Sequence, residues 1–276
     1  MKIVALATCA KLPELDEEER LVLGPLSDLG IRAVPAVWDD PTVDWSSFDL
    51  TVLRTTWDYA TRRDEFLAWA RTVPRLLNPA ATVEANTDKR YLASLAVPTV
   101  PTVFLAPGEP FTAPGGEYVL KPTVSAGSLD TGRYGPADEP LAAAHVARLH
   151  AAGRTVMVQP YLTAVDDAGE TALLYFDGEF SHAIRKGPML TGPDLGTDGL
   201  FHGEEITARV PSAAERALAD ALVGSLDAPL YARVDLIPGP DGAPVLVELE
   251  LTEPSLFLGH DPGAPARFAR AIAARL

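Results

Sequence analysis

The sequence predicts an α/β protein with a parallel sheet at its N-terminal end that continues into antiparallel hairpins. Its 276 residues are enough for about two domains, or three small ones. In the first 75 residues, apolar β-rich runs at 2–7, 31–38 and 49–54 alternate with helical patterns. Alternating strands and helices are typical of a βαβ unit with a parallel sheet. Strand pairs separated by turn residues follow in the C-terminal half, and they predict antiparallel hairpins.

Two helices are expected between the first strands. Apolar residues recur at helical spacing over 16–29, although Gly24-Pro25 should kink that helix, and again over 63–73. The loop after the first strand reads Thr8-Cys-Ala-Lys-Leu-Pro and lacks the glycine pattern that cradles a dinucleotide. The N-terminal sheet therefore offers no cradle for a dinucleotide cofactor.

The loop after the third strand carries chemistry that a plain turn does not need. Leu53-Arg54-Thr55-Thr56-Trp57-Asp58-Tyr59 lies where ligands of open parallel sheets bind, beyond the carboxyl ends of the strands. An arginine fork matches a carboxylate or phosphate, so Arg54, Thr55 and Asp58 are predicted to contact the substrate. The alternatives are a loop folded on Trp57, or an Arg54–Asp58 pair that fixes the loop.

The middle of the chain holds two candidate phosphate-binding lysines. Asn78-Pro79 and the Ala/Thr stretch after it are expected to form a linker, and Asn86 to cap a helix over 87–96. Lys89 falls in the first turn of that helix, where the dipole disfavours a cation, so it needs solvent or an anion. Lys121 ends a strand over 117–122.

The loop after Lys121 is rich in glycine and hydroxyl residues. Residues 123–132, including Ser125, can present backbone N–H groups to phosphates, but the order of lysine and glycines is not that of a P-loop. A helix over 139–152 should end at Gly153. The strand after it, over 155–162, contains Pro160 and is expected to act as a hinge.

Two hairpins are predicted downstream. The first joins strands at 171–176 and 179–186 through Asp177-Gly178, a strong two-residue turn signal, and leads to a glycine-rich loop at 187–203 that carries His202. A helix with a Ser212/Glu215 capping box follows. The second hairpin joins 231–237 to 244–250, and a helix closes the chain.

Three carboxylates converge on the second hairpin. Strand side chains alternate, so Glu248 and Glu250 share a face, which Asp235 on the partner strand can reach. Such carboxylates repel one another unless a cation neutralises them, and their oxygens suit Mg²⁺. The alternative is an edge hairpin whose acidic face is simply solvated.

Composition excludes several classes of partner. With 23 basic and 38 acidic residues, the net charge of −15 argues against binding to nucleic acid or an anionic membrane. A single cysteine, Cys9, fits a reducing cytoplasm, and the apolar run at 3–7 is too short for a signal peptide. A soluble cytoplasmic protein is expected.

The order of these motifs resembles the ATP-grasp superfamily, in which two α+β subdomains grip ATP between them. The resemblance covers the whole chain and implies an N-terminal βαβ domain (1–85), a lid subdomain (86–160) and a C-terminal subdomain with the metal hairpin (161–276). The R-x-T-W-D-Y loop, N-T-D-K, K-P-x-x-S-A-G and H-A-x-R-K-G resemble the group containing O-ureido-serine cyclo-ligase, the last enzyme of cycloserine synthesis.

The resemblance implies a role for each site residue. Lys89, Lys121 and Ser125 would bind the ATP phosphates, and Gln159 and Tyr161 would border the adenine. The remaining implied positions are Glu170 at the ribose or metal, Arg185 and Arg233 as catalytic cations at the phosphoryl group, and Asp235, Glu248 and Glu250 around Mg²⁺. Glu250 departs from the superfamily pattern, which usually has asparagine there.

The implied reaction uses ATP and Mg²⁺, with Mn²⁺ as a substitute, to activate the carboxylate of a small amino-acid-like substrate as an acylphosphate. An amine, in the same molecule or a second one, then captures it. Phosphoryl transfer needs positioning and charge neutralisation, which metal and Lys/Arg supply. An amino acid or peptide ligase, a small-molecule kinase and a nucleotide-binding module without turnover are the alternatives. The oligomeric state stays open, with a homodimer among the options.

Overall fold

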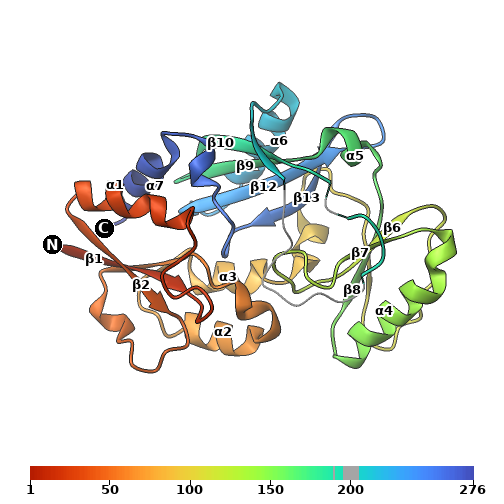
Figure 1. Ribbon diagram of the computed structural model, residues 1–276, viewed down its shortest axis with the longest axis horizontal. Helices are drawn as coiled ribbons and strands as arrows, with labels where there is room; N and C mark the ends of the chain where they lie inside the picture. The colour runs from red at the N-terminus through yellow and green to blue at the C-terminus, as the bar shows by residue number, and fades with distance from the viewer. Residues whose placement is uncertain (189, 195–204) are drawn as a thin grey trace.

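Three β-sheets and the helices around them make up the chain (Figure 1). The computed structural model describes residues 1–188, 190–194 and 205–276. The N-terminal sheet and the C-terminal sheet lie side by side, and the sheet from the middle of the chain lies with helix α4 (Glu139–Ala151) at the opposite end of the view from the N-terminal strands (Figure 1). No helix in these described ranges is long and apolar enough to cross a membrane.

The N-terminal sheet is parallel, as predicted, with strand order β2-β1-β3-β4. Its strands are β1 (Lys2–Thr8), β2 (Ile31–Val37), β3 (Leu50–Leu53) and β4 (Leu76–Leu77). Helix α2 (Arg63–Ala70) follows β3. The helix expected over 16–29 is instead a 3₁₀ turn, η1 (Glu19–Val22), followed by the short α1 (Leu23–Asp28). Pro25 lies in the first turn of α1, where a missing N–H costs no intrahelical bond.

The segment after β4 differs from the prediction. Residues expected to form a linker are helix α3 (Ala80–Asn86), so Asn86 ends a helix and does not cap one. The next helical stretch is the 3₁₀ turn η4 (Lys89–Ser94), which Asp88 caps by accepting a hydrogen bond from the Arg90 backbone N–H at 3.1 Å. Asn86 is then available for contacts with the C-terminal sheet.

The second sheet is antiparallel and has the order β5-β8-β6-β7. Its strands are β5 (Val103–Leu105), β6 (Tyr118–Pro122), β7 (Gly132–Tyr134) and β8 (Val156–Pro160). Helix α4 (Glu139–Ala151) packs on it through Ala142, Val146 and Leu149, which share a core with Leu120 and Val158. Gly153, just after α4, has a positive φ of 71°, as expected for the residue that ends a helix.

The third sheet, near the C-terminus, has five strands in the order β11-β10-β9-β12-β13, and every neighbouring pair is antiparallel. They are β9 (Glu170–Phe176), β10 (Glu179–Lys186), β11 (Ile206–Arg209), β12 (Tyr231–Pro238) and β13 (Pro244–Glu250). The helices around it are α5 (Ala164–Ala168), α6 (Ala213–Gly224) and α7 (Ala264–Ala273). Both predicted hairpins are confirmed, whereas β11 was not predicted.

The two faces of the C-terminal sheet have different neighbours because side chains alternate along each strand. Leu173, Tyr175 and Val234 share one core with α6 residues such as Leu222. Leu174, Phe176 and Tyr231 point the other way and share a core with α7 and the N-terminal sheet. The polar residues of this second face continue beyond the apolar ones, and they form the site described below.

Candidate active site

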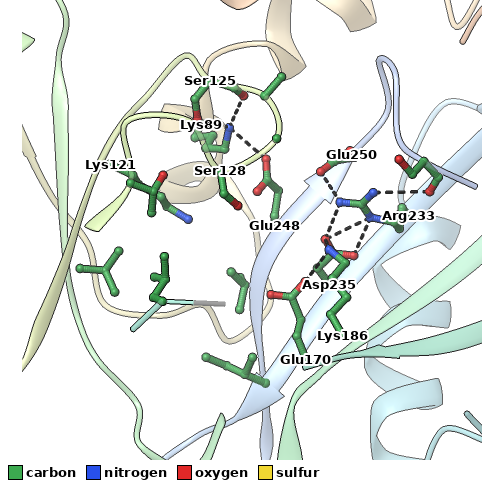
Figure 2. Close-up of a pocket in the computed structure, with 18 of the residues that line it drawn as sticks. Lys89, Lys121, Ser125, Ser128, Glu170, Lys186, Arg233, Asp235, Glu248 and Glu250 are labelled. Carbon is green, nitrogen blue, oxygen red and sulfur yellow. Dashed lines mark hydrogen bonds and ion pairs between the residues drawn. The ribbon is translucent and has the colours of Figure 1, made fainter. Parts of the chain in front are cut away.

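A cavity of about 390 Å³ opens between elements that belong to all three parts of the chain. Its walls come from the glycine-rich loop after β6, the strand β8, the β9–β10 and β12–β13 hairpins, and two loops of the N-terminal sheet. Figure 2 shows lysines and an arginine among carboxylates from several of these elements. Ten of the predicted site residues line this cavity, and the paragraphs below place each one.

The carboxylates and their cations share one face of the sheet through strand register. Asp235 pairs with Glu248, Arg233 pairs with Glu250, and Lys186 pairs with Glu170 in the β-ladders. Residues paired across a ladder point to the same face. The D…E-x-E alternation expected from the sequence is therefore present, on the face that borders the cavity.

Lys89 bridges the glycine-rich loop and the β12–β13 hairpin. Its Nζ donates to Ser125 O at 2.9 Å and to Ser125 Oγ at 3.2 Å, and it lies 3.0 Å from Glu248 Oε1 (Figure 2). Only 5% of the residue is exposed. Of the two partners expected for Lys89, solvent or an anion, the structure has an anion, Glu248.

Lys121 lies beside Lys89 but is held differently. Its side chain points into the cavity without a hydrogen bond or ion pair to any residue in the described ranges (Figure 2). Burial lowers its pKa, and the nearby Glu248 charge opposes that effect. A buried ammonium that faces a cavity without a partner is suited to an anionic ligand.

Arg233 and Lys186 neutralise the other carboxylates. Arg233 Nη2 donates to Asp235 Oδ2 at 2.8 Å and also pairs with Glu250, whereas Lys186 Nζ lies 2.8 Å from Asp235 Oδ2 and 2.6 Å from Glu170 Oε1. Burial opposes the charged form of Asp235, but the charges of Arg233 and Lys186 outweigh it and lower its pKa to about 2. Burial and the Glu248 charge raise the pKa of Glu250 to about 7.

The three predicted metal ligands do not form a cluster in this structure. In the described part of the chain, no group of three or more His, Cys, Asp or Glu side chains is arranged to hold a metal ion. Asp235, Glu248 and Glu250 are each paired with a lysine or arginine instead. Their oxygens still fit Mg²⁺ chemically, since that ion takes one or two carboxylates and leaves other positions to phosphate and water.

The residues expected at the adenine and ribose also line the cavity. Gln159 Nε2 donates to Thr102 Oγ1 at 2.8 Å, and the Tyr161 hydroxyl donates to Asp166 at 2.5 Å. Apolar side chains of Val100, Ile237 and Val247 lie in the same wall. Glu170 faces the carboxylates through Lys186, and burial raises its pKa.

Arg185 does not face the cavity, which corrects its expected role at the phosphoryl group. Its Nε donates to Ala168 O at 2.8 Å and its Nη2 to Asp167 O at 3.2 Å, so it ties β10 to α5. Lys186, one residue further along the strand, points to the opposite face and lines the cavity. Of the two adjacent cations, Lys186 therefore borders the cavity and Arg185 does not.

Arg54 corrects the substrate-clamp prediction. It is fully buried, and its Nε and Nη2 form a bidentate pair with Glu19 at 2.7 and 2.8 Å. Nη1 donates to Leu53 O and Nη2 also to Pro254 O. A guanidinium occupied in this way cannot bind a substrate carboxylate.

Thr55 and Asp58 are likewise absent from the described cavity wall. Thr55 Oγ1 lies 2.5 Å from Thr8 Oγ1, and Asp58 accepts a hydrogen bond from Trp38 Nε1 at 2.9 Å. Asp58 pairs with Arg62 at 3.7 Å, so the alternative Arg54–Asp58 pair is also wrong. The aromatic residues of the same loop, Trp57 and Tyr59, do line the cavity.

Comparison with known proteins now identifies the family. A family model described as the N-terminal domain of D-cycloserine synthetase DcsG matches residues 4–78. The cycloserine biosynthesis protein DcsG of Streptomyces lavendulae is 41% identical, with 100% of this chain and 99% of that protein covered. This chain belongs to the DcsG family.

Solved structures agree with that assignment. The crystal structure of D-cycloserine synthetase DcsG matches with a TM-score of 0.88 and 39% identity over 99% of each chain. A D-alanine–D-alanine ligase from Bacillus anthracis complexed with ATP matches with a TM-score of 0.65 and 14% identity, over 100% of this chain and 97% of that one. The fold is therefore the ATP-grasp fold, and this member of the DcsG family is an ATP-grasp ligase, an ATP-dependent enzyme that joins a carboxylate to an amine.

Several cavity residues of this DcsG-family site were not predicted from the sequence. Glu253 is buried, and burial together with the Glu250 charge raises its pKa to about 8, while the Tyr59 hydroxyl interacts with it. Asn86 also lines the cavity. The sequence did contain a signal for Glu253, because it is a further acidic residue only three positions after Glu250, just beyond the end of the hairpin. Of the glycine-rich loop at 187–203, residues 189 and 195–203, including His202, lie outside the described residues.

Proposed function

We propose that this DcsG-family ligase closes a ring within a small amino-acid-like substrate, with O-ureido-D-serine as the first candidate. The carrying observation is 41% identity to a cycloserine biosynthesis protein along the whole chain. The substrate carboxylate attacks the γ-phosphate of ATP, which releases ADP and leaves an acylphosphate. An amine nitrogen of the same molecule then displaces phosphate and forms the C–N bond.

The buried lysines support the proposed binding of ATP. Lys89 and Lys121 lie beside the Ser125 loop, and we assign them to the ATP phosphates because charge-assisted contacts are the strong ones in such sites. Gln159 and Tyr161 are assigned to the adenine side. Neutralisation of phosphate charge by fixed cations favours phosphoryl transfer without a covalent nucleophile on the protein.

The metal half rests on donor chemistry. Asp235, Glu248 and Glu250 are the proposed Mg²⁺ ligands, with Glu170 on the ribose or metal side, and Mn²⁺ is proposed to substitute. When bound, the ion neutralises charge on the phosphates. For the chain's own part, Lys89 has to exchange Glu248 for phosphate, and Arg233 stays at the junction of Asp235 and Glu250 as the proposed catalytic cation.

Three coarser features complete the proposal. The domain division is 1–85, 86–160 and 161–276, with each part holding one of the three sheets. The partner is a small molecule, and neither nucleic acid nor membrane, on the net charge of −15. A cytoplasmic location is proposed for the same protein, and its oligomeric state stays open, with a homodimer as one option.

Product analysis tests this function. ADP release is measured with ATP and Mg²⁺ across amino acids and β-substituted serines, with O-ureido-D-serine included. The expected result is ADP and phosphate in equal amounts with one cyclic product that requires the carboxylate. A stable phosphate ester on a hydroxyl would show a kinase, and a product that needs a second amino acid would show a peptide ligase.

A pair of matched variants locates the chemistry. Glu248→Gln keeps the shape of the side chain but removes its charge, and it should nearly abolish Mg²⁺-dependent turnover in a folded protein. Glu179→Gln, an exposed position at the start of β10, should turn over as the parent protein does. Unchanged turnover in Glu248→Gln would remove Glu248 from the metal site.

A further inference from the structure

The loop that follows the metal hairpin has no regular structure, yet most of it is buried. Residues 251–257 run from the end of β13 to the turn before α7, outside any helix or strand. Leu251, Thr252, Glu253 and Leu256 are each at most 7% exposed. A buried loop has to find partners for its backbone groups, because unpaired polar groups away from water are costly.

Side chains supply those partners, carbonyl by carbonyl. The seven consecutive carbonyl oxygens from 251 to 257 each accept a hydrogen bond from a side chain. In order, the donors are Asn78 (2.7 Å), Tyr231 (2.8 Å), Trp57 (3.0 Å), Arg54 (2.5 Å), Arg233 (3.4 Å) and His182, which serves the last two (3.0 and 3.2 Å). We call this set the donor series.

The donor series joins two parts of the chain. Arg54, Trp57 and Asn78 come from the N-terminal sheet and its loops, whereas His182, Tyr231 and Arg233 come from the C-terminal sheet. Glu19 holds Arg54 and also accepts the Leu256 N–H at 3.3 Å. Hydrogen bonds to its backbone therefore hold the loop against both sheets at once.

Several residues of this loop line the cavity. Glu253, Ser255, Leu256 and Phe257 all belong to the wall of the same cavity as the two phosphate-binding lysines. Phe257 has a φ of +47°, a conformation that L side chains rarely adopt and that persists only when the surroundings enforce it. His182, the last member of the donor series, holds this conformation through its hydrogen bonds to the carbonyls of 256 and 257.

We propose that Arg54, Asn78 and Tyr231 are positioning residues for the substrate half of the ligase reaction. None of the three lines the cavity, and each acts by fixing the backbone of 251–257, so that the loop side chains hold the substrate near the γ-phosphate. This inference rests on the proposed function. Because preorganised contacts raise the rate, a loosened loop weakens substrate binding or turnover and leaves ATP binding unchanged.

The first test is Tyr231→Phe, which removes one hydroxyl and keeps the buried ring. The matched control is Tyr118→Phe, whose buried hydroxyl has no hydrogen-bond partner in the described ranges. Tyr231→Phe is expected to raise the substrate KM, or lower kcat, by about tenfold with the ATP KM within about twofold, since the loss falls on one half of the site. Tyr118→Phe should match the parent protein in both.

A second pair covers the N-terminal donors. Trp57→Phe removes the indole N–H that reaches Glu253 O, and Trp69→Phe removes an indole N–H that has no partner in the described chain. Because the Trp57 ring itself lines the cavity, the readout for this pair is amide exchange in 251–257, which is expected to be faster in Trp57→Phe than in Trp69→Phe. If thermal melting shows that Tyr231→Phe does not fold, Trp57→Phe replaces it as the test variant.

Hydrogen exchange separates this inference from the proposed function, because it needs no substrate. Amides within 251–257 should exchange at least about tenfold faster in Tyr231→Phe than in Tyr118→Phe, while amides of β12 away from residue 231 keep their rates. Unchanged exchange in the loop, or equal rises in the substrate and ATP KM, would overturn the positioning role. If no substrate supports ADP release in the parent protein, the proposed function fails, and the exchange result still decides the inference.

Discussion

Two cations near the ends of strands, Lys121 and Arg54, have opposite surroundings in the folded chain. Lys121 lies one residue before the end of β6 and points into the cavity with no partner in the described ranges, whereas Arg54 follows β3 and is fully buried against Glu19. From the sequence, both looked like ligand-binding cations. The difference lies in an acidic partner 35 residues before Arg54, which only the folded chain brings close. A cation is available to a ligand where the fold has not already neutralised it.

The largest effect that tests this comparison is expected at Arg54. Arg54→Ala leaves the buried Glu19 carboxylate without its cation, which costs about 3–5 kcal/mol for a broken buried pair. Arg54→Ala combined with Glu19→Leu should recover part of that loss, because no unpaired charge remains. Denaturant unfolding of both variants gives the two free energies. A substrate clamp would instead leave the unfolding free energy of Arg54→Ala near that of the parent protein.

A smaller effect with the opposite pattern is expected at Lys121. Lys121→Met should weaken ATP binding by an order of magnitude or more, because a charge-assisted contact to phosphate contributes roughly 1.5–3 kcal/mol. The ligand-free protein should melt at the same temperature or higher, since burial disfavours the Lys121 charge. Nucleotide titration and thermal melting measure the two quantities. A drop in melting temperature with unchanged ATP affinity would make Lys121 structural.

The fold and half of the site could be predicted because their signals are local. Strand alternation placed Glu248 and Glu250 on one face, and the Asp177-Gly178 turn located a hairpin. Arg185 and the cavity-lining Lys186 are neighbours on one strand, and a one-residue shift moves a side chain to the other face. Neither the pattern nor the composition distinguishes Arg185 from Lys186.

The rest depended on contacts between distant segments. Asn78-Pro79 and the Ala/Thr stretch after it were predicted to be a linker because small residues dominate there. Instead α3 forms and brings Asn86 to the C-terminal sheet, where Asn86 Nδ2 donates to Leu249 O at 2.8 Å. The 251–257 loop depends on donors up to 200 residues away. No spacing rule links such positions, so sequence periodicity carried no information about them.

The smallest expected effect concerns pH and contrasts two carboxyl groups. Asp235 has its pKa lowered to about 2 by cations, whereas Glu253 has its pKa raised to about 8. A carboxyl with a raised pKa holds its proton in the folded state, so it lowers stability as pH rises from its unfolded pKa toward 8. Glu253→Gln should therefore gain about 1–2 kcal/mol over the parent protein between pH 5 and 7.

Thermal melts of metal-free Glu253→Gln and the parent protein across that pH range measure the effect. The difference in melting temperature should widen steadily toward pH 7 and be smallest near pH 5. A constant difference across the range would mean that Glu253 is ionised in the folded protein, and that its neighbourhood resembles that of Asp235.

The donor series has a consequence for how a family with this fold can diversify. Its hydrogen bonds are made to main-chain carbonyls of residues 251–257, so they do not depend on which side chains most of those residues carry. Inserting or deleting one residue would misalign every bond beyond it, whereas exchanging the side chain at 255 or 257 would disturb none of them. The length of this loop is therefore constrained, whereas the side chains at its cavity-facing positions can vary. A change of substrate can then arise by substituting those side chains without moving the loop backbone.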